Sequence, residues 1–334
     1  MNSVDYVPLM LIFLTIAFSR IRNNPERDVL LSRQNSLVWK GILAFFVMFS
    51  HISPLYSGGI ILPYFYNLGF ISVGIFFFIS GYGLMKQDIR REDYHVGFLK
   101  KRFSKILLPY LFVTLIYWLY YYLIGERHSL FYVIDAIVKG DPIVSFSWYI
   151  VEILILYLFF YVSMLIFKRK HLAVLIANAV FCILICFCFY KLDFRVAWYR
   201  STYMYVIGLL GALYEGQIVR LMKKYCIYLA IVSGIGLFLT FNNENLFILR
   251  EICMLLLIVS VCHRFEFHNA FLELSGKISM EIYLIHGLAM KFIRRFINDS
   301  NSWISIMYIV VLTFAAAFVL NFIFKKSFSR RKDS

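Results

Sequence analysis

Charged residues are scarce in this chain. Of its 334 residues only 16% are charged, whereas 61% are hydrophobic. A soluble domain carries roughly a quarter charged residues, and no polar stretch here is long enough to form one. Apolar runs of about 17 to 22 residues instead recur from end to end, which is typical of a protein with many membrane-spanning helices.

Proline and cysteine are also rare, with six residues each. The prolines do not recur symmetrically and no internal repeat stands out, whereas transporters often carry inverted repeats with paired, broken helices. The cysteines form no CxxC pair and no Cys/His metal spacing. We therefore expect buried thiols rather than disulfides or ligands, and no metal site.

Eleven apolar segments are predicted as membrane helices, because backbone groups in lipid must be hydrogen-bonded within their own segment. The fold class is therefore all-α, a polytopic transmembrane helix bundle of about ten core spans plus an extra N-terminal span. The segments are 4–19, 36–53, 67–85, 104–124, 147–167, 172–190, 201–215, 226–241, 246–262, 278–293 and 303–324.

We divide the chain into an N-terminal accessory span with its loop (1–35), a membrane domain (36–325) and a basic tail (326–334). The first run lacks a basic n-region and a small-residue cleavage site, so we expect an uncleaved span rather than a signal peptide.

Lysine and arginine are distributed unevenly between the two predicted sides. With the N-terminus outside, 25 of the 34 basic residues fall in the inner stretches and 8 in the outer ones. This bias follows the positive-inside rule and places the C-terminus in the cytoplasm. The positive-inside rule accounts for the net charge of +15, and some of the basic residues could also contact anionic lipid in the bilayer. No nucleic-acid partner is expected.

Two histidines stand within apolar segments. His51 closes the run 36–53, and His286 follows Tyr283 by three residues, so Tyr283 and His286 share a helix face. Ionisable side chains inside a membrane are costly and are functional candidates by default. The structural alternatives are a His51 that bonds to a headgroup or neighbour at the outer interface, and a His286 that forms an interhelical hydrogen bond.

Two further stretches have both a chemical and a structural interpretation. Trp148 and Glu152 share a face at the outer end of 147–167, where Glu152 could orient an imidazole or simply reach the interface. Ser80, Gly81 and Gly83 permit close helix packing, or they could leave room for a substrate.

The stretch 86–110 carries the densest cluster of basic residues. Positive-inside topology accounts for the cluster. It could also bind a phosphate-bearing donor, because the arginine fork suits bidentate phosphate recognition. The candidates are Arg90, Arg91, Lys101, Arg102 and Lys105.

Five signposts in order resemble the integral membrane acyltransferase-3 family, which includes polysaccharide O-acetyltransferases. The resemblance spans residues 36–290, and YVIGLLGALY (205–214) is similar to a further family helix. The signposts are Lys40-Gly41 opening a span that closes on His51, FFFISGYGL (76–84), a basic loop running to Arg102 and Pro109, SWYIVEIL (147–154), and ISMEIYLIH (278–286).

The resemblance implies an integral membrane O-acyltransferase of the bacterial cell (inner) membrane. It would move an acetyl or similar short acyl group from acyl-CoA to a hydroxyl of a cell-surface glycan or its lipid-linked precursor, with His51 as general base. At 1.5 Å per residue, Lys40 and His51 lie about 16 Å apart along one helix, a distance that a pantetheine arm could cover.

From the residues themselves we predict roles for the other candidates, with Glu152 or Tyr283 orienting His51 and Arg102 anchoring the donor. The catalytic group is His51, Glu152, Tyr283 and His286; the donor group is Lys40, Arg90, Arg91, Arg102 and Lys105; the acceptor group is Trp148 and Ser80.

Two other functions remain open from the residues alone. An exporter or flippase of a glycan or lipid-linked saccharide also suits a polytopic, aromatic-rich chain. A glycan polymerase usually needs large polar outer loops, and the longest here, 125–146, is modest. Loss of ester groups with intact glycan chains would indicate an acyltransferase, whereas loss of polymer would indicate export.

Overall fold

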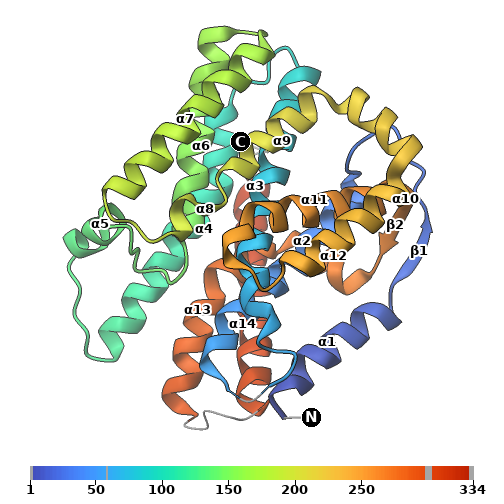
Figure 1. Cartoon of the computed structure of the whole chain (residues 1–334). Coiled ribbons are helices and arrows are strands. Elements are labelled where there is room, and N and C mark those ends of the chain that lie inside the picture. The colour runs from blue at the N-terminus through green and yellow to red at the C-terminus, as the bar shows by residue number, and fades with distance from the viewer. Residues whose placement is uncertain (1–2, 58, 298–302, 331–334) are drawn as a thin grey trace.

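A computed structural model of the chain describes residues 3–57, 59–297 and 303–330. Within these ranges the chain is mostly helical (Figure 1). Eight helices are long and apolar enough to cross a membrane, which confirms the predicted all-α polytopic bundle. They are α2 (Arg33–Ile52), α3 (Tyr64–Arg90), α4 (Phe98–Leu123), α6 (Trp148–Phe167), α7 (His171–Lys191), α10 (Glu215–Thr240), α11 (Phe247–Arg264) and α14 (Trp303–Arg330).

Three further helices occupy the remaining predicted segments. They are α1 (Tyr6–Ala17), α9 (Tyr203–Leu213) and α13 (Ser279–Phe296). The helix α13 is the most polar of the three, and it packs beside α14 (Figure 1). Short helices also form in the predicted loops, namely α5 (Leu130–Val138), α8 (Ala197–Arg200) and α12 (Ala270–Lys277), with the 3-10 turns η1 (Ser3–Asp5), η2 (Ser53–Leu55) and η3 (Glu244–Leu246).

Two short strands, which the sequence did not predict, join loops that are far apart in the chain. The strands β1 (Arg20–Asn23) and β2 (Phe265–His268) pair antiparallel, with Arg20 opposite His268. Glu266 accepts hydrogen bonds from Arg22 Nε at 2.6 Å and from the His268 ring at 2.9 Å. Burial alone would raise the pKa of Glu266, but the hydrogen bonds from His268 and Arg22 outweigh burial and hold this pKa below its usual value.

Glycines allow the closest helix contacts. A Cβ added at Gly81 of α3 would overlap the Tyr205 carbonyl oxygen of α9, and one added at Gly208 of α9 would overlap the Phe78 carbonyl oxygen of α3. Small residues let helix backbones approach in this way, so Gly81 has the packing role. A Cβ at Gly83, in contrast, would meet no atom within 4 Å.

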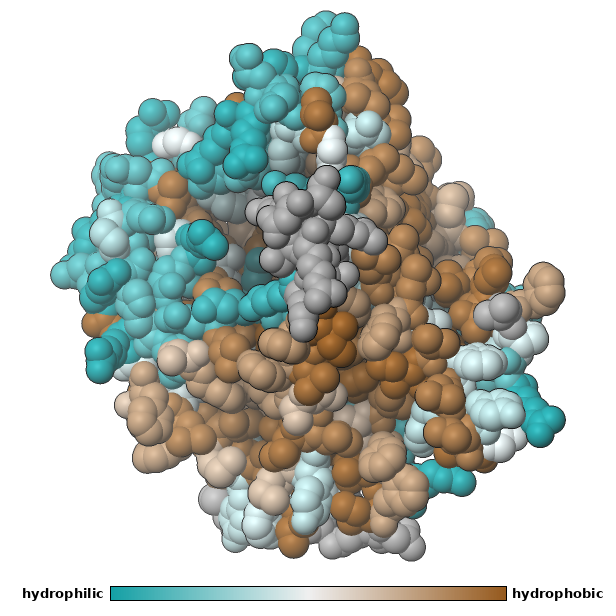
Figure 2. Space-filling model, turned by 180° about the vertical axis from the view of Figure 1, so that it is seen from behind, coloured by the Kyte–Doolittle hydropathy of each residue, from teal (hydrophilic) through white to brown (hydrophobic). Residues whose placement is uncertain are grey.

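Among the described residues, ion pairs join stretches that were assigned to the same side of the membrane, except Arg250–Glu244, whose arginine lies inside a predicted span. Figure 2 shows hydrophilic residues gathered at the upper left of the view and a smaller group at the lower right, with a broad hydrophobic surface between them. The predicted basic tail begins inside α14, and residues 331–334 lie outside the described residues. The pairs on the inner side include Arg22–Glu266, Lys86–Glu215, Arg169–Glu92 and Lys223–Asp28; those on the outer side include Lys139–Asp135, Arg195–Asp141 and Arg200–Glu244.

Candidate functional site

The two predicted histidines lie together although they come from helices far apart in the chain. His51 lies in the last turn of α2, and His286 lies in the middle of α13. Their ring centroids are 5.3 Å apart with an interplanar angle of 20°. The Phe146 ring stacks on His51 with a centroid distance of 3.6 Å. The Phe146 and His286 centroids are 5.5 Å apart, so the three nearly parallel rings form one cluster where α2 ends.

The two imidazoles differ in their hydrogen bonds. His286 is completely buried, and its Nδ1–H donates to the Ile282 carbonyl oxygen at 3.2 Å. Its Nε2 has no partner among the described residues. For the partly exposed His51 ring, the described part of the chain likewise offers no hydrogen bond. Because a neutral imidazole carries one nitrogen lone pair, His51 can accept a proton from a molecule beside it.

His51 faces a cavity of about 330 Å³, here called the histidine cavity. Its volume is near the lower end of the range of roughly 300–1,000 Å³ typical of ligand pockets. Aromatic rings are prominent in its wall. The wall includes His51, Tyr66, Phe70, Phe146, Trp148, Trp198 and Tyr283, with Ser50, Asp141, Ser147 and Arg195 as its other polar residues.

The loop between α5 and α6 closes this cavity under backbone strain. Phe146 has a φ of 66°, a left-handed conformation that costs a non-glycine residue about 1–2 kcal/mol. Two hydrogen bonds hold the loop: the Tyr283 hydroxyl donates to the Phe146 carbonyl oxygen, and Trp198 Nε1 donates to the Gly140 carbonyl oxygen at 2.9 Å. Strained residues of this kind cluster at functional sites.

Glu152 lies one turn deeper than Trp148 and is not part of the wall of the histidine cavity. Its carboxylate is fully buried and accepts a hydrogen bond from Thr202 Oγ1 at 2.5 Å. No hydrogen bond or ion pair joins Glu152 to His51 among the described residues. Ser80 is close enough to hydrogen-bond the Tyr149 hydroxyl, and it is not among the residues of the cavity wall.

The predicted donor residues gather at the opposite end of the bundle. Arg102 donates from its guanidinium to the Tyr94 hydroxyl at 2.6 Å, and Lys40 is close enough to interact with Arg102 electrostatically. A hollow of about 100 Å³ lies here, and Arg91, Lys101 and Arg102 contribute to its lining. We call it the arginine hollow.

The remaining two donor candidates, Arg90 and Lys105, lie exposed on the surface. The arginine hollow and the histidine cavity have no lining residue in common, so any connection between the two ends runs through the packed interior.

Tyrosine side chains occupy the depth between these two ends. The Arg102 guanidinium interacts electrostatically with the hydroxyls of Tyr157 and Tyr205. Tyr157 interacts in turn with Tyr149, whose ring centroid lies 5.6 Å from that of Tyr283 in the wall of the histidine cavity. Tyrosine side chains therefore lie between the guanidinium and the histidines.

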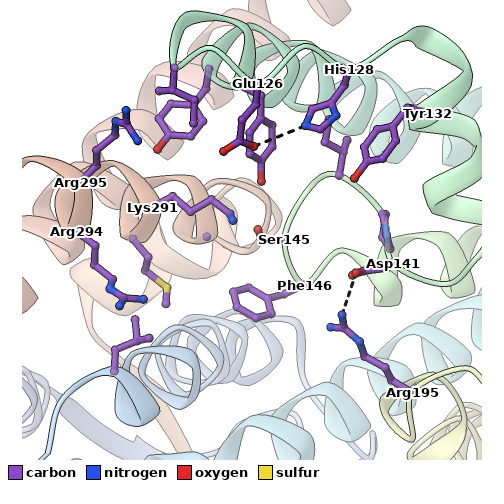
Figure 3. A pocket seen from close by; sticks show the side chains of 18 residues that line it. Glu126, His128, Tyr132, Asp141, Ser145, Phe146, Arg195, Lys291, Arg294 and Arg295 are labelled. Atoms are coloured by element: carbon purple, nitrogen blue, oxygen red, sulfur yellow. Dashed lines mark ion pairs between the residues drawn. The ribbon is translucent and has the colours of Figure 1, made fainter.

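A second and larger cavity of about 750 Å³ (Figure 3) has Phe146 in its wall, as the histidine cavity does. Sequence reasoning missed Phe146 and the cations of this cavity. One signal was present: Lys291, Arg294 and Arg295 have i, i+3 and i+4 spacing, which places them on one helix face. Within the described part of the chain, no group of three or more His, Cys, Asp or Glu side chains is arranged to hold a metal ion.

Comparison with known protein families matches residues 38–324 to a family model described as an acyltransferase domain. The matched range runs from α2 into α14 and includes His51, His286 and Arg102. Neither the curated proteins nor the solved structures show a significant match to the chain.

Proposed function

Since the chain belongs to the acyltransferase-3 family, we propose that it is an O-acyltransferase that uses acyl-CoA. It would transfer an acetyl or similar short acyl group to a hydroxyl of a cell-surface glycan or its lipid-linked precursor. The observation that carries the proposal is the position of His51. Its ring faces an aromatic-walled cavity and has no hydrogen-bond partner among the described residues. Aromatic walls with a few polar groups suit the apolar faces and hydroxyls of a sugar ring.

The acyl donor would bind at the opposite, basic end. Arg102 and Lys40 supply positive charge there, and arginine suits the phosphates of CoA. The pantetheine arm would follow the tyrosines and carry the thioester toward His51, with Ser80 and Glu152 beside its path. Because the two ends share no cavity wall, helices must separate slightly for the arm to enter. In a bacterial inner membrane, the basic end would face the cytoplasm, where acyl-CoA is found.

The reaction would follow the ordinary course of acyl transfer. His51 takes the proton of the acceptor hydroxyl while that oxygen attacks the thioester carbonyl carbon. The carbon–sulfur bond breaks, and the departing CoA sulfur receives the proton, so the products are the ester and CoA thiol. Tyr283 acts as a positioning residue, because it holds the carbonyl of Phe146, which stacks on the His51 ring.

Mass spectrometry of the host's surface glycan, with and without this gene, tests the proposal. In the strain without the gene, we expect each modified sugar to lose the mass of one acyl group, while the length of the glycan chain stays the same. The variant His51→Gln should behave like the deletion. The control variant His171→Gln removes an imidazole from the far end of α7, 3.5 Å from Asp88, and should keep the ester. Loss of polymer rather than of ester would refute transfer and would favour export.

A further inference from the structure

Cations dominate the larger cavity next to Phe146, here called the cationic cavity. Its wall carries four permanently cationic side chains against two carboxylates. Figure 3 shows Lys291, Arg294 and Arg295 coming from one helix, α13, on one side of the cavity. The other cation of the wall, Arg195, is paired with Asp141 at 3.0 Å.

The two carboxylates of the wall pair with other described residues rather than with the three cations of α13. The second carboxylate of the wall, Glu126, lies across the cavity and 3.8 Å from His128 Nε2. No ion pair joins Lys291, Arg294 or Arg295 to an acidic residue within the described ranges. Three cations on one helix face, turned toward a cavity, are suited to phosphate oxygens.

An apolar groove of about 620 Å³ begins where the cationic cavity ends. Tyr120 lies in the walls of both. The groove runs along the hydrophobic flanks of α4, α13 and α14, so it faces the lipid. One face of α13 therefore carries the cations, and a neighbouring face lines the groove. The wall of the apolar groove includes Phe112, Ile116, Leu123, Ile285, Phe292, Ala315 and Ile323.

The cationic cavity and the histidine cavity also adjoin each other. Asp141, Pro142, Phe146 and Arg195 lie in the walls of both. The three hollows therefore follow one another: an apolar groove open to lipid, a cationic cavity, and an aromatic cavity that ends at His51. This order matches a molecule that carries a hydrocarbon chain, an anionic link and a sugar in that sequence.

We propose that the acceptor is a lipid-linked saccharide, with its isoprenoid chain in the apolar groove and its phosphate or diphosphate on Lys291, Arg294 and Arg295. The inference rests on the proposed function and selects the lipid-linked precursor over the finished surface glycan. An ordinary phospholipid shares the chain and the phosphate, but it has no sugar to fill the aromatic cavity beside His51.

Binding of decaprenyl phosphate to the purified full-length protein, followed by native mass spectrometry, tests the phosphate site. The variant Arg294→Gln/Arg295→Gln should weaken binding about tenfold or more, because two charge-assisted hydrogen bonds are lost. The matched control Lys139→Gln/Lys191→Gln removes two cations of the same side that lie outside the cavity wall; it should bind like the unmodified chain. Decaprenol, which lacks the phosphate, should bind at least about tenfold more weakly than decaprenyl phosphate.

A second pair of variants tests the groove. Ala315→Trp fills the groove and should weaken decaprenyl phosphate binding, whereas Val311→Trp, on α14 outside the groove wall, should not. Equal binding by the Arg294/Arg295 variant and its control would overturn the inference. Equally effective competition by phosphatidylglycerol would also overturn it, because the site would then take any anionic lipid. His51→Gln should bind decaprenyl phosphate normally, so this binding experiment can fail or succeed independently of acyl transfer.

Discussion

Replacing Tyr283 by phenylalanine removes one oxygen atom from the wall of the histidine cavity. The ring contacts with Tyr149 and His286, at centroid distances of 5.6 and 5.9 Å, stay in place. The Phe146 carbonyl loses the donor that holds it. An unsatisfied buried carbonyl costs about 1–3 kcal/mol, which is comparable with the ~1–2 kcal/mol cost of the left-handed conformation of Phe146.

Without this hydrogen bond, the loop lowers its free energy by leaving the strained conformation. A change of about 1–3 kcal/mol shifts a two-state equilibrium roughly 5- to 150-fold. If catalysis needs Phe146 stacked on His51, the rate of ester formation should fall within that range. The thermal unfolding midpoint should change little, because the loop can relax without disturbing the packed helices.

Ester formation in membranes that contain the host's glycan, normalised to the amount of protein, is the assay. Tyr203→Phe is the matched control, since that hydroxyl donates to Glu251 at 2.9 Å and does not contact Phe146. It should retain most of the activity. The reasoning fails if Tyr283→Phe keeps full activity, or if both variants lose activity equally.

Three further predictions concern the packing, the donor end and the strands. Gly208→Leu places side-chain atoms against the Phe78 carbonyl oxygen and should destabilise the protein by at least about 1–3 kcal/mol, measured by thermal unfolding in detergent. Arg102→Gln should raise the KM for acyl-CoA roughly 10- to 100-fold and leave the KM for the acceptor unchanged. Glu266→Gln should lower stability by about 1–2 kcal/mol near neutral pH. Since the pKa of Glu266 is held below its ordinary value, this stability is present above that ordinary value and disappears as the pH falls through the folded-state pKa. An equal loss at acidic and neutral pH would contradict the role of the carboxylate.

The length of apolar runs was sufficient to predict where helices form, although eight of the described helices, rather than eleven, are long and apolar enough to cross a membrane. Each of the eleven predicted segments contains or overlaps a helix, because the bilayer thickness and the backbone hydrogen bonds leave few alternatives. The strands β1 and β2 could not be predicted in the same way. A four-residue strand has too few residues for a hydrophobic period, and pairing between residues 20–23 and 265–268 depends on the assembled bundle.

The candidate site was predictable only in part, for a related reason. The cost of polar groups in a membrane drew attention to His51 and His286, and the structure places their rings 5.3 Å apart. Which aromatic ring would cover them depends on the loop conformation of Phe146, which nothing in its local sequence specifies. The contact of Glu152 with Thr202 likewise depends on how α6 and α9 are rotated against each other.

Sealed vesicles of opposite orientation test the two-sided site most directly. Acetyl-labelled acetyl-CoA is added only to the outside of inverted and of right-side-out vesicles prepared from the host. We expect label on the glycan in inverted vesicles, whose exposed side would carry Arg102 and Lys40 in the proposed orientation. We expect none in right-side-out vesicles until detergent opens them. Equal labelling of both sealed preparations would contradict a donor that enters from the basic end and meets the acceptor at His51.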